Sequence, residues 1–272
     1  ITVNIPNATC ATLNIAPVTN AISQLAFNAN MKLTVLGTVT LGDAGNTNRR
    51  GNLNMTNAGI LECKGIALGN AGANTYTAGS GTIIFTANNT LPTTIITSFN
   101  NLVINAGTTT LASAKNSTAA GSVTVKEGAT LALSTFNYGA TTAPTSLSLV
   151  GGAATGASIT GSGTFSLGGN VTVFDATTGS SGATISCPVS LGSTRTFTIS
   201  DDGTTAADLT MSGQISGAAG IIKTGSGTMV LSGGNTFSGT TTISTGILNV
   251  QNIAGLGTTA GGTTVSSGAE LQ

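Results

Sequence analysis

Thr242-Ile-Ser-Thr-Gly246 and Thr264-Val-Ser-Ser-Gly268 are two versions of one short phrase, and the second follows the first after 22 residues. Each phrase is an alternating strand pattern closed by a glycine. A further apolar strand follows each glycine, as Ile247-Leu-Asn-Val250 and Ala269-Glu-Leu271. Self-similarity at a fixed period of about 20 to 50 residues is the signature of a repeat architecture.

The same phrase recurs through the first half of the chain. It ends at Gly37, Gly59, Gly81, Gly107 and Gly128, at intervals of 21 to 26 residues. A second phrase, Gly-Ser-Gly-Thr followed by an apolar triplet, begins at Gly79, Gly161 and Gly225. Between residues 151 and 213 the composition persists but the strict spacing is lost. The repeat therefore extends over the whole chain.

A unit of this length holds two or three short strands joined by glycine-rich bends. Such a unit cannot bury its apolar face alone, whereas coiling the chain stacks each unit on the previous one and buries a shared core. The sequence therefore predicts an all-β, right-handed parallel β-helix (β-solenoid) with rungs of about 20–22 residues, as a single domain over residues 1–272. About 13 rungs would make a rod ~60 Å long. A β-sandwich and a propeller are the alternatives, but sandwiches use aromatic anchors and propeller blades repeat near 40–50 residues.

The composition excludes several classes of partner. Only 6% of residues are charged, and eight cations balance eight anions. Without a basic patch, we expect no nucleic-acid binding and no attraction to anionic lipid. No apolar run reaches the ~18 residues of a membrane helix, so we expect no membrane insertion of this segment. No signal peptide is visible at Ile1, and we interpret the chain as a mature or excised segment.

Two local features are open to alternatives. Ile22, Leu25 and Ala26 have helical spacing, but we favour strands there because Leu25-Ala-Phe27 and Leu33-Thr-Val35 alternate. The chain has three cysteines: Cys10, Cys63 and Cys187. Cys10 and Cys63 would lie ~11 Å apart along the axis, beyond the reach of a disulfide. We interpret the cysteines as small buried hydrophobes, with bonding between chains as the alternative.

The stretch Gly220-Ile-Ile-Lys-Thr-Gly-Ser-Gly-Thr-Met-Val-Leu-Ser-Gly-Gly-Asn-Thr-Phe-Ser-Gly-Thr-Thr-Thr-Ile-Ser-Thr-Gly-Ile-Leu-Asn-Val250 resembles the autotransporter-associated β-strand repeat. That family pattern runs Lys-x-Gly-x-Gly-Thr, an apolar strand, Gly-x-Asn-Thr-aromatic-x-Gly, then a Thr-rich strand, Gly and Leu. The resemblance assigns residues 218–272 to this repeat region, with Leu256 to Gln272 continuing the pattern. Residues 1–111 are similar, more loosely, to strand repeats of large secreted surface proteins of Bacteroidetes-type bacteria, through Thr82 to Phe85 and Ser98 to Asn105.

The resemblance implies a parallel β-helix on a Gram-negative outer surface, in an adhesin, a passenger or a filament. The family motif marks a structural rung and carries no catalytic residues. We therefore assign no catalytic, cofactor-binding or metal-binding residues and no cofactor.

A search for chemistry gives one carboxylate cluster, Asp201-Asp202 with Asp208. A calcium site or an acid pair is one interpretation. A solvated turn is the favoured one, because Asp-Asp-Gly203 is a turn signal. Without histidine there is no Ser-His-Asp triad and no histidine metal ligand. We interpret the other charged residues without assigning them chemistry. Glu62, Glu127 and Asp175 are expected to be isolated surface charges, and Arg49-Arg50 to lie in a loop or to dock an anionic partner. The Gly-Ser-Gly phrases are expected to be corners of the solenoid.

Threonine and asparagine patterns complete the search. The phrases starting at Thr38, Thr75, Thr108, Thr196 and Thr240 read Thr-x-Thr, but at irregular intervals. An ice-binding array needs one such phrase per rung, so we expect ordinary outward threonines. Asn-x-Ser/Thr occurs at five sites, which chance explains in so Asn- and Thr-rich a chain. These sites are Asn7, Asn54, Asn88, Asn116 and Asn170.

The prediction is a non-catalytic extracellular structural or adhesive module on the bacterial outer surface, as a stalk or a self-assembling filament subunit. The alternative is a carbohydrate-binding or polysaccharide-degrading β-helix protein, which needs a groove lined with carboxylates and aromatics. Thr263 to Gln272 break off within a strand pattern. We therefore expect other copies, end to end, or adjoining segments of a parent chain as partners, with surface glycans as a further partner class.

Overall fold

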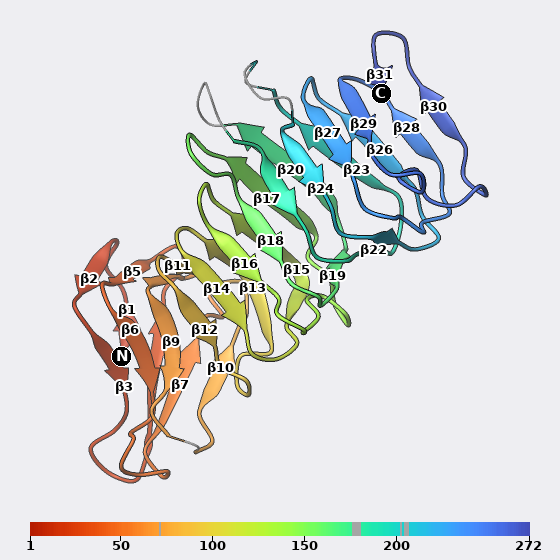
Figure 1. The fold of residues 1–272 in the computed structure, drawn as a ribbon. Helices are drawn as coiled ribbons and strands as arrows, with labels where there is room; N and C mark the ends of the chain where they lie inside the picture. Colours follow the sequence, from red (N-terminus) through yellow and green to blue (C-terminus); the bar gives the residue numbers. More distant parts are fainter. Residues whose placement is uncertain (71, 176–180, 202, 204–206) are drawn as a thin grey trace.

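The protein is a β-solenoid in which every named strand pairs in parallel, as described by a computed structural model of residues 1–70, 72–175, 181–201, 203 and 207–272. Its coils lie side by side along one axis, and the two termini lie at opposite ends (Figure 1). The described residues contain no helix. They therefore contain no helix of the length and apolarity that crossing a bilayer would require.

The main sheet has 12 strands, one from each coil. In order along the axis they are β2 (Ala8–Cys10), β5 (Lys32–Val35), β8 (Ile60–Cys63), β11 (Thr82–Phe85), β13 (Ser98–Ile104), β15 (Asn116–Val125), β17 (Ser146–Gly151), β20 (Asn170–Asp175), β23 (Arg195–Ile199), β26 (Ile221–Thr224), β28 (Thr241–Ile243) and β30 (Thr263–Val265). This sheet is continuous from one end of the solenoid to the other.

A second face follows the main sheet in each coil. It begins with a three-stranded sheet of β3 (Leu13–Ile15), β6 (Thr38–Leu41) and β9 (Gly65–Leu68). It continues with a nine-stranded sheet, the second sheet: β12 (Asn89–Leu91), β14 (Thr108–Leu111), β16 (Thr130–Ala132), β18 (Ser158–Thr160), β21 (Ala183–Ile185), β24 (Leu209–Met211), β27 (Thr228–Leu231), β29 (Ile247–Val250) and β31 (Glu270–Leu271).

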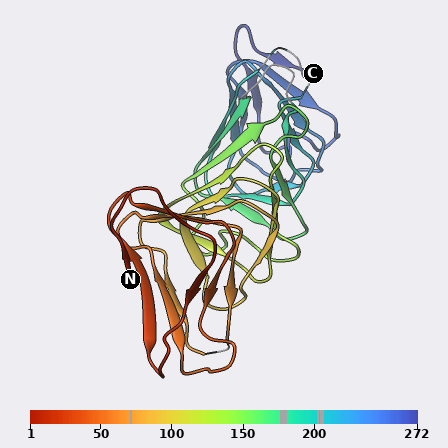
Figure 2. The ribbon, with the colours of Figure 1, turned by 90° about the vertical axis from the view of Figure 1, so that its left-hand side faces the viewer.

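A third face precedes the main sheet in the coils that have it. Near the N-terminus it contains β1 (Thr2–Val3), β4 (Ile22–Phe27), β7 (Arg50–Asn54) and β10 (Thr75–Thr77). Farther along it contains β19 (Phe165–Leu167), β22 (Val189–Leu191) and β25 (Ile215–Ser216). Between the two sheets, Tyr138 forms single bridges to Lys115 and Phe165. Figure 2 shows the coils of the N-terminal half and the C-terminal half turned relative to each other.

The core consists of columns of inward side chains in register. Leu33, Leu61, Ile83 and Leu102 form one column through four successive coils, and all are buried. Because neighbouring residues of a strand point to opposite faces, every second side chain joins a column and the others face solvent. At about 25 cal/mol per Å² of apolar surface, this shared burial stabilises each coil only when its neighbours are present.

The parallel solenoid predicted from the repeat is confirmed, and the hand of the coil stays a prediction. The predicted count of about 13 rungs is too high, because 12 strands of the main sheet make about 11 turns. The spacing between paired residues of the main sheet ranges from 18 (Ser98 to Asn116) to 28 (Leu33 to Leu61). Loops at the corners absorb this variation while the strands keep their register. At ~4.8 Å per coil, 11 steps give a rod of about 53 Å.

The corners explain the glycine phrases. Gly79, Gly161 and Gly225, which open the three Gly-Ser-Gly-Thr phrases, have positive φ angles of 49°, 120° and 79°. A side chain at Gly225 would also place its Cβ 2.2 Å from the carbonyl oxygen of Ile199 in the preceding coil. Glycine is therefore required there both for the turn and for the close approach of two coils. The prediction that these phrases are corners is confirmed.

The two local predictions also agree with the structure. Residues 22–27 and 32–35 form strands β4 and β5, so no helix replaces them. All three cysteines are free, with Cys63 and Cys187 buried and Cys10 partly buried. Burial raises the pKa of both buried thiols to about 12, because a thiolate would lose its hydration.

Candidate functional site

Lys223 lies at an inward position of the main sheet, where the neighbouring coils place Phe197 and Ile243. Its side chain is fully buried. A charge in such a column is costly unless hydrogen bonds replace its hydration. Burial lowers the pKa of Lys223 to about 8, while the nearby carboxylate of Asp208 acts in the opposite direction.

Three carbonyl oxygens replace water around the ammonium group of Lys223. It donates to the carbonyls of Thr224 and Gly225 in its own coil, at 3.0 and 2.9 Å. It also donates to the carbonyl of Thr245 in the next coil, at 3.2 Å. The lysine therefore closes the end of β26 and joins two coils.

Lys115 has a similar role at another corner. Its side chain is buried, and its ammonium donates to the carbonyl of Pro92 and to the hydroxyl of Ser113, both at 2.7 Å. Pro92 belongs to the preceding coil, so this lysine also joins two coils. Burial lowers the pKa of Lys115 to about 8.

Asn235 joins three coils at once. The backbone N–H of Ile215, in the preceding coil, donates to its side-chain oxygen at 2.8 Å. Its amide nitrogen donates to the carbonyl of Gly255, in the following coil, at 2.6 Å. Only 2% of Asn235 is exposed, so both partners depend on this side chain and not on water.

Other asparagines make the same kind of contact nearer the surface. The side-chain oxygens of Asn88, Asn137 and Asn170 accept the backbone N–H of a residue one coil farther on, at 2.8 to 3.0 Å. Asn116 accepts two N–H groups of the next coil in the same way, from Thr141 and Thr142. Three of the five Asn-x-Ser/Thr positions therefore have a structural function.

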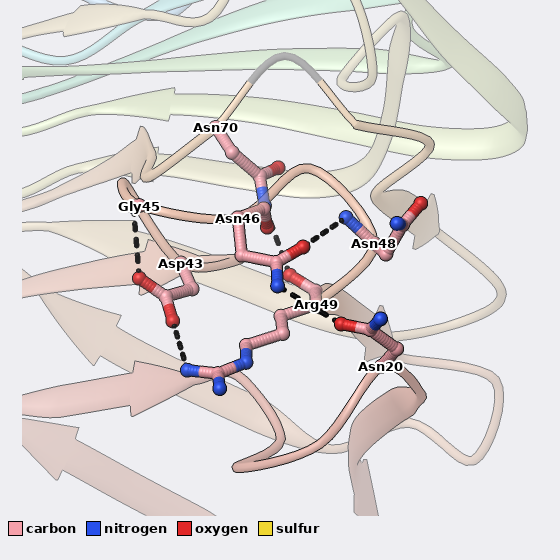
Figure 3. Close-up of polar contacts among 7 residues, drawn as sticks. All are labelled: Asn20, Asp43, Gly45, Asn46, Asn48, Arg49 and Asn70. Carbon is pink, nitrogen blue, oxygen red and sulfur yellow. Dashed lines mark hydrogen bonds and ion pairs between the residues drawn. The ribbon is translucent and has the colours of Figure 1, made fainter.

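Figure 3 shows a polar corner near the N-terminus that we call the asparagine corner. Its residues are Asn20, Asp43, Gly45, Asn46, Asn48, Arg49 and Asn70. The carboxylate of Asp43 accepts the N–H of Gly45 at 3.0 Å and pairs with the guanidinium of Arg49 at 2.7 Å. The pKa of Asp43 is lowered mainly by the hydrogen bond from Gly45 and to a smaller extent by the hydrogen bond from Arg49.

Amide contacts extend this corner across three coils. Asn46 donates to the side-chain oxygen of Asn20, at 2.9 Å. Asn70 donates to the carbonyls of Asn46 and Arg49, at 2.8 and 2.9 Å. Both oxygens of Asp43 are already occupied by protein donors. The corner can therefore fix loops against one another, and its chemistry does not favour a cation.

The predicted carboxylate cluster is not a joint site in the described residues. Asp201 is exposed, and its carboxylate accepts the N–H of Gly203, which makes the turn that the sequence indicates. Asp208 is buried, and its carboxylate accepts the N–H of Thr228 at 2.6 Å. Asp202 lies outside the described residues. The favoured interpretation of a turn thus holds for Asp201, whereas Asp208 is an interior residue.

The remaining charged residues are scattered. Glu62 pairs with Lys32 at 2.6 Å on the outer side of the main sheet. Arg49 pairs within its own loop, and Arg50 begins β7. Glu127 is exposed, and Asp175 ends β20. Within the part of the chain that the structure describes, no three His, Cys, Asp or Glu side chains are close enough together to hold a metal ion.

The sequence reasoning missed Lys115, Lys223, Asp208 and Asn235 as interior polar residues. Lys223 carries a signal that could have found it, because Ile221-Ile-Lys223 puts the lysine at the same alternation as the inward Ile221. Asn235 and Lys115 carry no comparable signal, since both lie in corners where the alternation is interrupted.

Comparison with known proteins agrees with this arrangement. Two 30-residue segments, residues 104–133 and 221–250, match the family described as Passenger-associated-transport-repeat. The first contains Lys115, and the second contains Lys223 and Asn235. No curated protein and no solved structure matches the chain. The match confirms the resemblance to an autotransporter passenger repeat, a family that implies secreted, surface-exposed proteins.

Proposed function

We propose that this protein is a non-catalytic structural and adhesive module on the outer surface of a Gram-negative bacterium, where it serves as a rigid stalk. The family match and the solenoid fit an autotransporter passenger domain. The main support is that both matched segments are coils of one continuous sheet. Ile104 lies in β13 and Ile221 in β26, and unbroken parallel pairing connects them.

Energetics support a stalk. Because each coil is stabilised by its neighbours, a solenoid resists bending and can hold a distant part of a protein away from the cell. Polar contacts between coils occur at the asparagine corner, at Lys115 and at Asn235, so they are spread along the rod. The low charge reduces attraction to unrelated surfaces.

Antibody labelling of intact cells tests the surface location. An antibody raised against the purified solenoid should label living cells, and brief treatment with external protease should remove the signal. A periplasmic protein serves as the control and should be neither labelled nor cleaved. Labelling that needs permeabilised cells would refute the surface role.

A reducing-sugar assay on a panel of polysaccharides tests the absence of catalysis, and we expect no release of reducing sugars.

Filament formation is a second form of the same function, and exposed inward positions at the two end coils favour it. In the last coil, Val265 and Leu271 are 43% and 39% exposed. At the other end, a cavity of about 260 Å³ is lined by Val3, Leu25 and Leu33, among others. Another coil, from the same polypeptide or from a second copy, would bury both surfaces.

Electron microscopy of the purified protein separates the two forms. Single rods near 53 Å, from 11 steps of ~4.8 Å, would support a stalk. End-to-end filaments with that repeat would support self-assembly, and replacing Val265 and Leu271 with lysine should then abolish them. Compact particles would contradict both forms.

A further inference from the structure

The outer side of the main sheet carries a row of hydroxyl groups in register that we call the hydroxyl ladder. Five successive coils each contribute one Ser or Thr, and pairing in register places each of them beside the one in the next coil. Its members are Thr124, Ser148, Thr172, Thr198 and Thr224. The inward neighbours of these residues fill the core, so the hydroxyls face solvent.

A second row runs beside the ladder, two residues earlier on each strand. It contains Ser122, Ser146 and Asn170 in register, and Thr196 follows through its N–H bond to Asn170. Neighbouring members of one row lie ~4.8 Å apart, and the two rows lie ~6.6 Å apart. A hydroxyl group can both donate and accept hydrogen bonds, and so can an amide; the hydroxyls of Thr198 and Thr224 lie 3.0 Å apart and bond to each other. The face is therefore a regular two-row array of neutral hydrogen-bonding groups.

This array is separate from the charged part of the same face. In the earlier coils the outer side of the main sheet carries the Lys32–Glu62 ion pair. From Ser122 to Thr224 neither row contains a charged residue by sequence, and the exposed Lys126, two residues after Thr124, lies beyond the edge of the two rows. The two rows themselves offer no charge to a charged partner. The chemistry instead fits a neutral partner that offers hydroxyl groups at a regular interval.

An independent feature indicates what else the partner must offer. Phe174 follows Thr172 by two residues in β20, so it stands on the same side of the sheet. Its side chain is 50% exposed, whereas Phe27, Phe85, Phe99, Phe165, Phe197 and Phe237 are buried. It pairs in register with the half-buried Val150. An exposed ring beside an apolar side chain provides a stacking surface for the C–H face of a ligand.

We propose that the hydroxyl ladder and Phe174 bind an extended, neutral, β-linked polysaccharide that lies along the solenoid axis. This proposal rests on the proposed adhesive function and names its ligand class. Sugar rings present hydroxyl groups at their edges and C–H groups on their faces, which match the two rows and the phenyl ring. The repeat of one coil is close to the length of one hexopyranose unit in an extended chain. Five coils therefore bind several units at once, over about 19 Å.

The geometry also explains why binding requires a chain and not a single sugar. A neutral hydrogen bond at an exposed face contributes little alone, because water competes for both partners. Successive units of one chain add their contacts without a new loss of translational freedom. Affinity should thus rise with the number of units and should change little with salt.

Pull-down and polarisation assays with the purified protein test the proposal. The probes are insoluble cellulose, chitin and curdlan, and labelled oligomers of each with two and six units. The test variant T172V/T198V removes two ladder hydroxyls and keeps the β-branched shape. The control variant T184V/T210V makes the same change in the adjacent coils of the second sheet, where Thr184 pairs with Thr210. A third variant, Phe174→Ala, removes the ring.

We expect retention on at least one polysaccharide, with six-unit oligomers binding more tightly than two-unit ones. The ladder variant should bind about tenfold more weakly, Phe174→Ala about fivefold more weakly, and the control variant as wild type does. Equal losses in the ladder and control variants, no retention on any of the three polymers, or salt-sensitive binding would overturn the proposal. Thermal hysteresis or ice adsorption without polysaccharide binding would also overturn it. Rods that label on intact cells but bind none of the polymers would refute this ligand and leave the stalk function standing.

Discussion

Replacing Asn235 with alanine should destabilise the solenoid more than any other single asparagine-to-alanine change among those described above. The substitution removes the acceptor for the N–H of Ile215 and the donor to the carbonyl of Gly255. These two groups belong to the coils on either side, so the change affects both coil interfaces. The backbone of residue 235 keeps its own bond from its N–H to the carbonyl of Ala254.

The magnitude follows from the burial of the two orphaned groups. Asn235 is 2% exposed, so bulk water does not reach the two groups, and one trapped water would restore their hydrogen bonds only in part. A buried polar group without a partner costs about 1–3 kcal/mol, so two groups cost about 2–6 kcal/mol. Asn88→Ala is the matched control. Its oxygen accepts one N–H, from Thr108, at an exposed corner, where water can replace it at a cost of about 0.5–1 kcal/mol.

Urea unfolding followed by far-UV circular dichroism measures both variants against wild type. Limited proteolysis then locates the damage, and we expect new cleavage near residues 213–217 and 252–257 in the Asn235 variant only. Because a solenoid can unfold in parts, the midpoint and the cleavage pattern should be interpreted together. Equal midpoints for the two variants would refute the reasoning, since they would mean that burial of the amide contributes nothing.

Three further predictions concern other buried groups. Raising the pH from 8 to 10 should increase the stability of the wild-type protein relative to that of Lys223→Met. The pKa of Lys223 is about 8 in the folded protein and 10.5 in the unfolded chain, so the unfolded chain binds more protons in this pH range. Urea midpoints at the two pH values measure the difference, and the opposite sign would mean that the carbonyl contacts outweigh desolvation. Iodoacetamide at pH 8 should label Cys10 of the native protein well before Cys63, because a pKa of about 12 keeps the buried Cys63 in the unreactive thiol form. Mass spectrometry after digestion measures the labelling of each cysteine, and equal rates would contradict this prediction. Gly225→Ala should lower the free energy of unfolding by over about 1 kcal/mol more than Gly203→Ala does. Both glycines have φ near 80°, but an added Cβ would lie 2.2 Å from the carbonyl oxygen of Ile199 at Gly225 and would meet no described atom within 4 Å at Gly203. Similar urea midpoints for the two variants would contradict this.

Much of the fold could be predicted because it follows from local rules. Alternation of apolar residues, β-branched composition and glycine at strand ends each indicate strands and corners, and the period indicates stacking. The glycines at positions 79, 161 and 225 show this well, since all three have the positive φ that their phrase predicts. The coil count was too high because corner loops vary in length, and a loop adds residues without adding a rung.

The candidate sites were harder to predict because they depend on register between coils. The members of the hydroxyl ladder are 24, 24, 26 and 26 residues apart in the sequence, so no fixed interval reveals them. The Thr-x-Thr phrases that the sequence does show lie on different sheets. Thr38 is in β6, Thr75 in β10 and Thr108 in β14, while Thr196 is in β23 of the main sheet. Only pairing between strands decides which threonines are neighbours.

Register is also the reason for the polar residues inside the core. Columns of valine, leucine and isoleucine are nearly interchangeable, so aliphatic packing alone would penalise a slip of one coil only weakly. Lys223 must meet the carbonyl of Thr245, and Asn235 must meet Ile215 and Gly255, so a slipped coil would leave each of them buried without partners. These residues fall within a matched passenger repeat. The repeat therefore supplies both the apolar columns that drive stacking and the polar contacts that select a single alignment of the coils.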